Sequence, residues 1–276
     1  NLAGVANVAL RQTRVGDLSM WKACAFSNAA RNGMFAALLA RRGMTGPAPI
    51  FEGEKGFMKL VSGPFELPML GGEAMPGGEP VPFKILKTCI KHFPVEYHAQ
   101  SAVEAALALR AELLATEGKT WINKVADVEI GSYDVAIEII GRDPEKWQPA
   151  TRETADHSFP YCVAVALLDG RVSMNSFSPK RLRDPRLHEL MKKIHVVKLA
   201  DLEHRYPTTM PTRLTIRTSQ GSTHSRQVDQ PLGHPGHPLS DQEVGDKLRR
   251  LTSRRIDRAQ LDRLLAFVWH LEDQTD

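Results

Sequence analysis

Histidine, tyrosine and arginine side chains gather at the polar start of an apolar stretch of this sequence, where they would suit acid–base chemistry. His157 and Tyr161 are four residues apart within residues 151–170, TRETADHSFPYCVAVALLDG, and Arg152 comes shortly before them. If a helix extends back to His157, both side chains share one face, one turn apart. The alternative is a capped core helix behind a solvated loop, and this stretch alone leaves it open.

The same stretch carries the signals that begin and end a helix. Ser158 can cap the helix with its hydroxyl, and Pro160 then falls in the first turn, where no backbone donor is lost. Gly170 is placed to end the helix. Residues 163–168 are apolar, so we expect them to be buried.

Two lysines lie close to predicted helices. Lys22 is near the start of an Ala- and Leu-rich stretch, residues 18–42, which predicts a helix ended at Gly43. Lys91 precedes a Phe-Pro turn that leads into a helix running to about Ala115. A lysine at such a position is usually a solvated surface charge, and that alternative stays open.

Three polar side chains, Tyr97, His98 and Gln100, follow the Phe-Pro turn. Polar side chains around a proline turn ahead of a helix are typical of the wall of a site. Side chains that only cap the start of the helix would give the same pattern.

The composition excludes several classes of protein. The 276 residues are 42% hydrophobic, and 36 Lys and Arg against 32 Asp and Glu give a net charge of +4. The basic residues are scattered and aromatic residues are few, so we expect a small anionic substrate and no nucleic-acid partner. Three separated cysteines provide neither a disulfide framework nor a metal or iron–sulfur pattern. No apolar run is long enough to cross a bilayer, which predicts no membrane partner.

Helix and strand signals are mixed between residues 84 and 232, which predicts an α+β domain. An Asp-Pro start marks an amphipathic helix in the segment DPRLHELMKKI. The expected strands alternate branched apolar with polar residues. They lie at residues 122–140, as one or two strands, around 196–199 and around 213–217.

Two Gly- and Pro-rich connections, residues 63–82 and 233–241, are the candidate domain boundaries. The second connection is followed by two predicted helices, at residues 240–252 and 257–273. The expected parts of the chain are therefore residues 1–83, 84–232 and 233–276.

Three separated stretches together resemble the signature of one family. They are MWKACAFSNAARNGMFAALLARRGMTGPAPIFEGEKGF, KHFPVEYHAQSAVEAA and TRETADHSFPYCVAVALLDG. The chain is similar to the MmgE/PrpD family over nearly its whole length. The runs PVEYHAQ and TRETADHS resemble the family's 2-methylcitrate dehydratase branch, and the family also includes cis-aconitate decarboxylases and an epimerase.

The resemblance implies a mainly α fold, in which both chain ends build an all-helical domain and an α+β lid domain is inserted between them. It implies a homodimer that works without a metal or other cofactor. It also implies a further N-terminal helical portion that carries part of the active site and has no match in this chain. Because the chain begins at Asn1 without methionine, we expect that portion to have been removed or to come from a separate chain.

The resemblance also implies roles for residues of the three stretches. Lys22 matches the lysine of the family's K-x-x-x-x-x-N-A-A-R helix, and Lys91 matches the lysine before the Phe-Pro turn. Tyr161 and His157 match the H-S-x-x-Y motif. These four are the expected catalytic residues, and the expected substrate-binding residues are Arg152, His98 and Gln100.

The implied activity is that of a hydro-lyase, which eliminates water from 2-methylcitrate, or from citrate, in the methylcitrate cycle of propionate catabolism. The product from 2-methylcitrate is 2-methyl-cis-aconitate, and the expected location is the cytoplasm, or the mitochondrial matrix in a eukaryote. Ala25 and Glu96 stand where decarboxylase-type members carry histidines, which favours the dehydratase branch. Decarboxylation, epimerisation and a non-enzymatic binding or assembly module are the alternatives.

Overall fold

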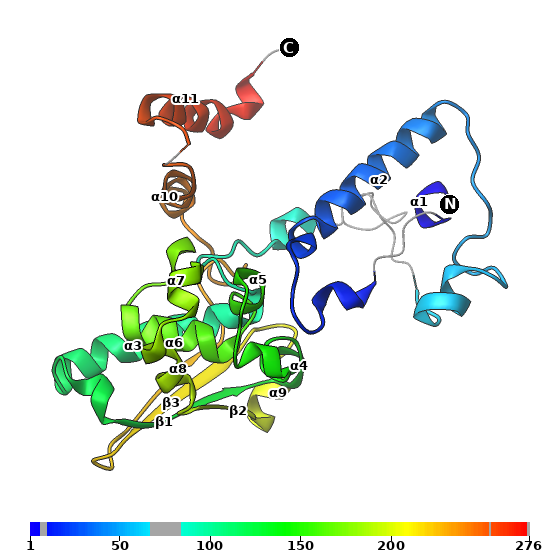
Figure 1. Cartoon of the computed structure of the whole chain (residues 1–276). Helices are drawn as coiled ribbons and strands as arrows, with labels where there is room; N and C mark the ends of the chain where they lie inside the picture. Colours follow the sequence, from blue (N-terminus) through cyan, green and yellow to red (C-terminus); the bar gives the residue numbers. More distant parts are fainter. Residues whose placement is uncertain (6–9, 67–83, 254, 275–276) are drawn as a thin grey trace, which may run out of the picture.

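The computed structural model describes residues 1–5, 10–66, 84–253 and 255–274. The described residues are mainly helical, with one four-stranded sheet that lies in a compact α/β body (Figure 1). The predicted boundary at residue 83, and most of the connection that precedes it, falls outside the described residues. The mainly α fold with an α+β region is therefore confirmed, and the predicted division into domains stays a prediction.

The sheet has the strand order β2-β1-β3-β4. β1 pairs parallel with β2 and antiparallel with β3, and β3 pairs antiparallel with β4. The parallel pair requires a long crossover, which the helices between β1 and β2 provide. The strands are β1 (Val125–Ser132), β2 (Ile194–Lys198), β3 (Thr212–Thr218) and β4 (Thr223–Val228).

Alternating side chains give the sheet one apolar and one polar face. Val128 and Ile130 of β1, and Leu214 and Ile216 of β3, are fully buried in the core. The positions between them hold mainly charged and hydroxyl-bearing side chains. The strands predicted at the start of 122–140, around 196–199 and around 213–217 are confirmed.

Three helices cover the apolar face of the sheet: α3 (Gln100–Thr116), α6 (Phe159–Asp169) and α8 (Pro185–Met191). α3 packs on α6, β3 and β4, while α6 packs on α8 and β2 (Figure 1). The first nine residues of α6 are all buried. A helix that is buried on every side lies in the middle of a core, and α6 holds this place in the body.

The predicted signals of α6 are confirmed. Ser158 caps the helix, because its Oγ accepts a hydrogen bond from the Tyr161 backbone N–H at 3.1 Å. Gly170 follows the helix with φ +67°, in the left-handed conformation that glycine adopts without strain. His157 precedes the cap, so the idea that the helix extends back to His157 is wrong.

The remaining helices and the short helical turns used below surround this core or project from it. Among the described residues, no helix is both long and apolar enough to cross a membrane. The helices are α1 (Leu2–Val5), α2 (Ala25–Arg41), α4 (Asp134–Ile140), α5 (Arg152–Ala155), α7 (Pro179–Leu182), α9 (Ala200–Glu203), α10 (Asp241–Thr252) and α11 (Arg258–Trp269). The short turns are η1 (Arg11–Arg14), η2 (Met20–Ala23), η3 (Met58–Ser62), η4 (Lys84–Lys87), η5 (Tyr97–Ala99), η6 (Trp121–Lys124), η7 (Pro144–Lys146), η8 (Met174–Phe177) and η9 (Leu271–Asp273).

Two segments differ from the expected secondary structure. The second half of residues 122–140 forms helix α4 instead of a strand, because Ala136 and Ile140, four residues apart, pack into the core and Gly141 follows as its C-cap. β4 is an additional strand whose polar sequence, THSRQV, gives little hydrophobic signal. Its position at the edge of the sheet accounts for that polarity.

The N-terminal part of the chain reaches the α/β body through residues 14–23, which we call the strap. Leu18 is the buried anchor of the strap, with only 3% of its surface exposed. Its backbone N–H donates to Oγ1 of Thr154 at 3.0 Å, and Thr154 is fully buried in α5. The strap includes η2, so its docking decides where Lys22 lies.

We predict that Leu18→Ala releases the strap. Truncating a buried leucine costs about 2–5 kcal/mol of stability. Here the lost free energy is that of the contact that holds the strap to the body. Trypsin should then cut after Arg14 and Lys22 about tenfold faster or more, as followed by mass spectrometry. Met20→Ala is the matched control, since Met20 is 77% exposed, and equal cleavage rates in both variants would contradict the anchoring role of Leu18.

Candidate active site

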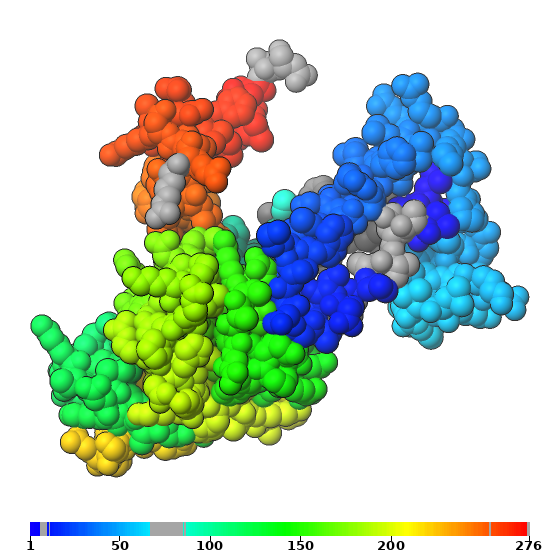
Figure 2. All heavy atoms as spheres, viewed as in Figure 1, coloured from blue at the N-terminus to red at the C-terminus, as the bar shows by residue number. Residues whose placement is uncertain are grey.

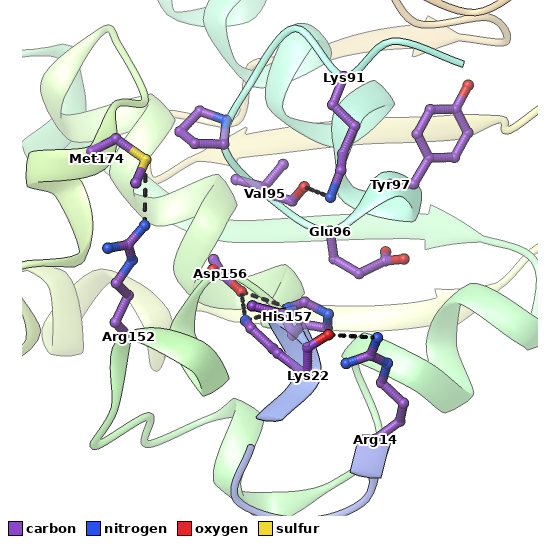
Figure 3. Close-up of a pocket in the computed structure, with 12 residues that line it drawn as sticks. Arg14, Lys22, Lys91, Val95, Glu96, Tyr97, Arg152, Asp156, His157 and Met174 are labelled. Atoms are coloured by element: carbon purple, nitrogen blue, oxygen red, sulfur yellow. Dashed lines mark hydrogen bonds and ion pairs between the residues drawn. The ribbon is translucent and has the colours of Figure 1, made fainter. Parts of the chain in front are cut away.

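A cavity of about 440 Å³, which we call the first cavity, lies where the strap meets the turn before α3 and the segment before α6 (Figure 3). Its charged lining residues come from all three segments. Four cations against two carboxylates leave an excess of two positive charges at the cavity wall. The cations are Arg14, Lys22, Lys91 and Arg152, and the carboxylates are Glu96 and Asp156.

Lys22 enters the first cavity from η2, where its Nζ contacts two oxygen atoms and lies 3.1 Å from Nδ1 of His157. Its Nζ donates to the Glu153 backbone carbonyl at 2.7 Å and forms an ion pair with Oδ1 of Asp156. Only 11% of the Lys22 side chain and 17% of the Asp156 side chain is exposed. Burial lowers the pKa of Lys22, against the opposing hydrogen bond and charge of Asp156.

Asp156 also binds the neighbouring His157, whose Nδ1 lies 2.5 Å from the same Oδ1 (Figure 3). Burial alone would raise the pKa of Asp156, but the hydrogen bonds from His157 and Lys22 outweigh it and lower the pKa. Burial lowers the pKa of His157, and the nearby Lys22 charge lowers it further. The carboxylate is therefore ionised and the imidazole neutral near pH 7.

These protonation states assign the tautomer of His157. Nδ1 lies 2.5 Å from the Asp156 carboxylate, which can only accept, and 3.1 Å from the Lys22 ammonium, which can only donate. We assign the proton to Nδ1 because its contact with the carboxylate is the shorter of the two. Nε2 then holds a lone pair, and it has no hydrogen-bond partner in the described parts of the chain. A neutral imidazole oriented by a carboxylate is the arrangement of a general base.

The opposite wall of the first cavity is the turn that begins at Lys91. The Lys91 Nζ donates to the Val95 carbonyl at 3.0 Å, which places the ammonium at the cavity (Figure 3). Gln100 braces the turn from behind, because its side chain accepts from the Phe93 N–H at 3.0 Å and donates to the Phe93 carbonyl at 2.9 Å. The position of Lys91 thus depends on a buried amide.

Two arginines complete the charged wall. Arg152 lies near Met174 of η8, with 3.5 Å between Nη2 and Sδ. The Arg14 Nη2 donates to the Lys22 carbonyl at 3.1 Å and so stiffens the strap. Its Nη1 is buried with no hydrogen-bond partner among the described residues, which leaves a donor available to an anion.

Of the seven predicted site residues, the structure brings Lys22, Lys91, Arg152 and His157 together at the first cavity. It does not place Tyr161 there. Tyr161 is fully buried in α6, and its hydroxyl donates to the Ser176 carbonyl at 2.8 Å. Burial raises the pKa of the phenol. In the described residues Tyr161 is a core contact that holds η8, and its predicted contact with substrate stays a prediction.

His98 and Gln100 also lie outside the lining of the first cavity, and their expected substrate contacts stay predictions. The His98 ring forms a hydrogen bond with the Tyr133 hydroxyl and packs against Tyr206, at 6.1 Å between ring centroids. Gln100 is fully buried and serves as the brace already described. Both side chains support the wall from behind.

The expected site omitted three charged residues of the cavity. Asp156 is next to His157 in the sequence, and a carboxylate adjacent to a candidate base was the available signal. Glu96 differs from the histidine of the decarboxylase pattern, and that difference alone does not indicate a site residue. Arg14 precedes the motif stretches, and nothing in its sequence surroundings indicates a site. Among the described residues, no group of three or more His, Cys, Asp or Glu side chains could hold a metal ion.

Comparison with known proteins gives matches along most of the chain. The MmgE/PrpD C-terminal domain matches residues 93–273, and the MmgE/PrpD N-terminal domain matches residues 1–69. The cis-aconitate decarboxylase of Mus musculus is 27% identical over 253 residues, which are 90% of this chain and 49% of that protein. The 2-methylcitrate dehydratase of Cupriavidus necator is 31% identical over 184 residues, 63% of this chain and 36% of that protein.

A third relative, the mitochondrial 2-methylcitrate dehydratase of Yarrowia lipolytica, is 27% identical over 256 residues, 89% of this chain and 46% of that protein. The chain thus spans about half the length, or less, of these relatives. The fold and the cavity define a mainly helical protein with an α+β body and a cavity whose lining carries an excess of cations. The chain belongs to the MmgE/PrpD family.

We predict that Tyr161→Phe lowers the free energy of unfolding by about 1–3 kcal/mol, because the buried Ser176 carbonyl loses its donor. Urea denaturation measures this change. Any activity of the protein should be nearly preserved, since the phenol does not line the first cavity. A loss of turnover of about a hundredfold with unchanged stability would contradict this placement and restore a role for Tyr161 as a proton donor.

Proposed function

We propose that this chain carries part of the active site of a hydro-lyase that eliminates water from 2-methylcitrate, or from a related tricarboxylate such as citrate. The observation that carries the proposal is the arrangement at Asp156, where one ionised carboxylate pairs with a lysine and orients a neutral histidine in a cationic cavity. Such an arrangement supplies a base and an anion site together. Relatives named 2-methylcitrate dehydratase support this choice of reaction.

In the proposed reaction, Nε2 of His157 takes a proton from a carbon next to a carboxylate of the substrate. The electron pair of that C–H bond forms a carbon–carbon double bond, and hydroxide leaves the adjacent carbon. Asp156 stabilises the imidazolium that forms, because their hydrogen bond becomes charge-assisted. The product from 2-methylcitrate is 2-methyl-cis-aconitate.

The cations have two tasks in this proposal. Lys91 and Arg152 bind carboxylates of the substrate and set its orientation. Lys22 stabilises the negative charge that develops on the carboxylate next to the reacting carbon. Their positions on separate segments suit a substrate with several carboxylates, since each segment can hold one group.

Decarboxylation of cis-aconitate is the second candidate, because the Mus musculus relative that carries this name matches 90% of the chain. Glu96 weighs against it. This carboxylate lines the first cavity at one of the positions where decarboxylase-type members carry a histidine. A carboxylate changes both the charge and the proton-donor capacity of that wall.

We also propose that a further helical portion covers α2 and α11, and that activity requires it. The two helices project from the body as separate arms in Figure 2. Large apolar side chains on both arms are exposed, among them Phe26 at 84% and Phe35 at 61% on α2, and Phe267 at 49% and Trp269 at 44% on α11. Apolar surface of this kind is typical of a buried helix interface. The covering helices would come from the same protein or a separate chain, and we propose a homodimer as the assembled form.

The proposal is tested by incubating 2-methylcitrate, citrate and cis-aconitate with the 276-residue chain, alone and joined to the N-terminal portion of the Cupriavidus necator relative. We expect the joined protein to convert 2-methylcitrate, as followed by the ultraviolet absorbance of the new double bond. The chain alone should show little activity. Carbon dioxide release from cis-aconitate would favour the second candidate, and inactivity on all three acids would refute a lyase function.

The pH dependence of the joined protein tests His157 as the base. Its pKa lies below the ordinary value of 6.5, and the neutral, active form is present above that lowered pKa. The acidic limb of kcat/KM should therefore lie below pH 6.5, and activity should fall only as the imidazole becomes protonated. His157→Gln should lower kcat by about 10²–10⁴-fold and remove this limb.

His195→Gln is the matched control, because His195 lies on the polar face of the sheet and its side chain is 42% exposed. Its pH profile should equal that of the parent. If the acidic limb moves in the His195 variant and stays in the His157 variant, His157 is not the base.

A further inference from the structure

A second cavity, of about 620 Å³, lies on the surface formed by the end of η8, α7 and the start of α8, and we call it the basic cavity. The segment that contains it forms part of the front of the body in Figure 2, in yellow-green. Its lining is rich in cations and does not include any residue of the first cavity. The cations are Lys180, Arg181, Arg183 and Arg186.

Two of these cations are held in place by carboxylates. Arg181 pairs with Asp169 at 2.5 Å and also with Asp184. Arg186 donates from Nη2 to Asp184 at 2.9 Å and from Nε to the other oxygen at 3.2 Å. The Arg186 hydrogen bond lowers the pKa of Asp184 to about 2, so this carboxylate stays ionised and keeps both guanidinium groups in place near pH 7.

The other two cations are free. Lys180 and Arg183 are exposed, and neither has an ion pair with a side chain in the described parts of the chain. The four cations and the two carboxylates, Asp169 and Asp184, leave an excess of two positive charges. Lys180 and Arg183 carry this excess. The cavity therefore has cations that are prearranged and cations that lack a counter-charge.

The turn beneath the basic cavity is anchored in the core. Leu182 and Leu187, on either side of the cation-bearing turn, are 7% and 0% exposed. Asp184 caps α8 by accepting from the Arg186 N–H at 2.9 Å. A ligand would therefore meet a surface whose backbone is already ordered, which reduces the entropic cost of binding.

The neutral lining residues limit the kind of ligand. Asn175 and Ser178 offer an amide and a hydroxyl, and the remaining lining residues are Pro185 and the carboxylate Asp184, which is paired with Arg181 and Arg186. No aromatic ring lines the cavity, so it lacks a platform on which a nucleobase could stack. Guanidinium forks, an ammonium group and neutral donors are the groups that bind phosphate oxygens.

We propose that the basic cavity binds a compact phosphate-bearing anion, such as pyrophosphate or a small phosphorylated metabolite, independently of the first cavity. Lys180 and Arg183 supply the uncompensated charge, and Arg181 and Arg186 supply prearranged donors. Asn175 and Ser178 complete the set of hydrogen bonds to the phosphate oxygens. The site is separate from the proposed dehydration, since its lining includes none of the residues assigned to that reaction.

Isothermal titration of the 276-residue chain with inorganic pyrophosphate tests the site. The double variant Lys180→Gln and Arg183→Gln should weaken binding at least tenfold. Both residues are exposed, so the fold should be kept, and circular dichroism checks this. The matched control removes two other exposed cations, with Lys119→Gln and Arg226→Gln, and should change the dissociation constant less than twofold.

Three outcomes would overturn the proposal. An equal loss in the control pair would show that pyrophosphate responds only to the net charge of the protein. A loss in Lys22→Met, with none in the Lys180 and Arg183 variant, would assign the binding to the first cavity. Displacement of pyrophosphate by an acidic peptide at equal concentration would show that the surface binds polyanionic protein segments instead.

Discussion

One carboxylate, that of Asp156, carries the constraint on which the site depends. It is mostly buried and must neutralise the ammonium of Lys22 while it accepts a hydrogen bond from His157. Removing two charges from water is costly unless each finds a partner. This geometry offsets that cost, because both charges are paired and the lysine gains a second acceptor at the Glu153 carbonyl. A histidine that stays neutral beside this pair is the chemical result.

The core of the body holds Asp156 and His157 in position. Asp156 and His157 lie in the short connection between α5 and α6, so the burial of α6 along nearly its whole length fixes their backbone. The Ser158 side chain fastens the same point, because it caps α6 and also donates to the Lys146 carbonyl. A shift of α6 would move the carboxylate away from the lysine. The packing of α6 in the core therefore fixes the position of Asp156 at the cavity.

Local signals predicted much of the fold, and long-range contacts account for the errors. The cap at Ser158, the stop at Gly170 and most strands follow from side-chain chemistry within a few residues. Nine successive residues of α6 are buried, so no periodicity shows that Tyr161 lies outside the cavity lining. His98 and Gln100 are polar residues near the site that support it from behind. The cavity brings together residues 14–23, 91–97 and 152–157, and no local pattern shows that these segments meet.

The strap completes the site through contacts between distant parts of the sequence. Lys22 and Asp156 are 134 positions apart in the sequence, so their contact closes a very long loop. The entropy of such a closure grows only with the logarithm of loop length, but contacts of high sequence separation form slowly. The body can therefore bury α6 and orient His157 before the lysine arrives. Arg14 and Lys22 of the strap then complete a cationic wall to which the body already contributes Lys91 and Arg152. An assembled cavity therefore requires that two segments far apart in the sequence have docked.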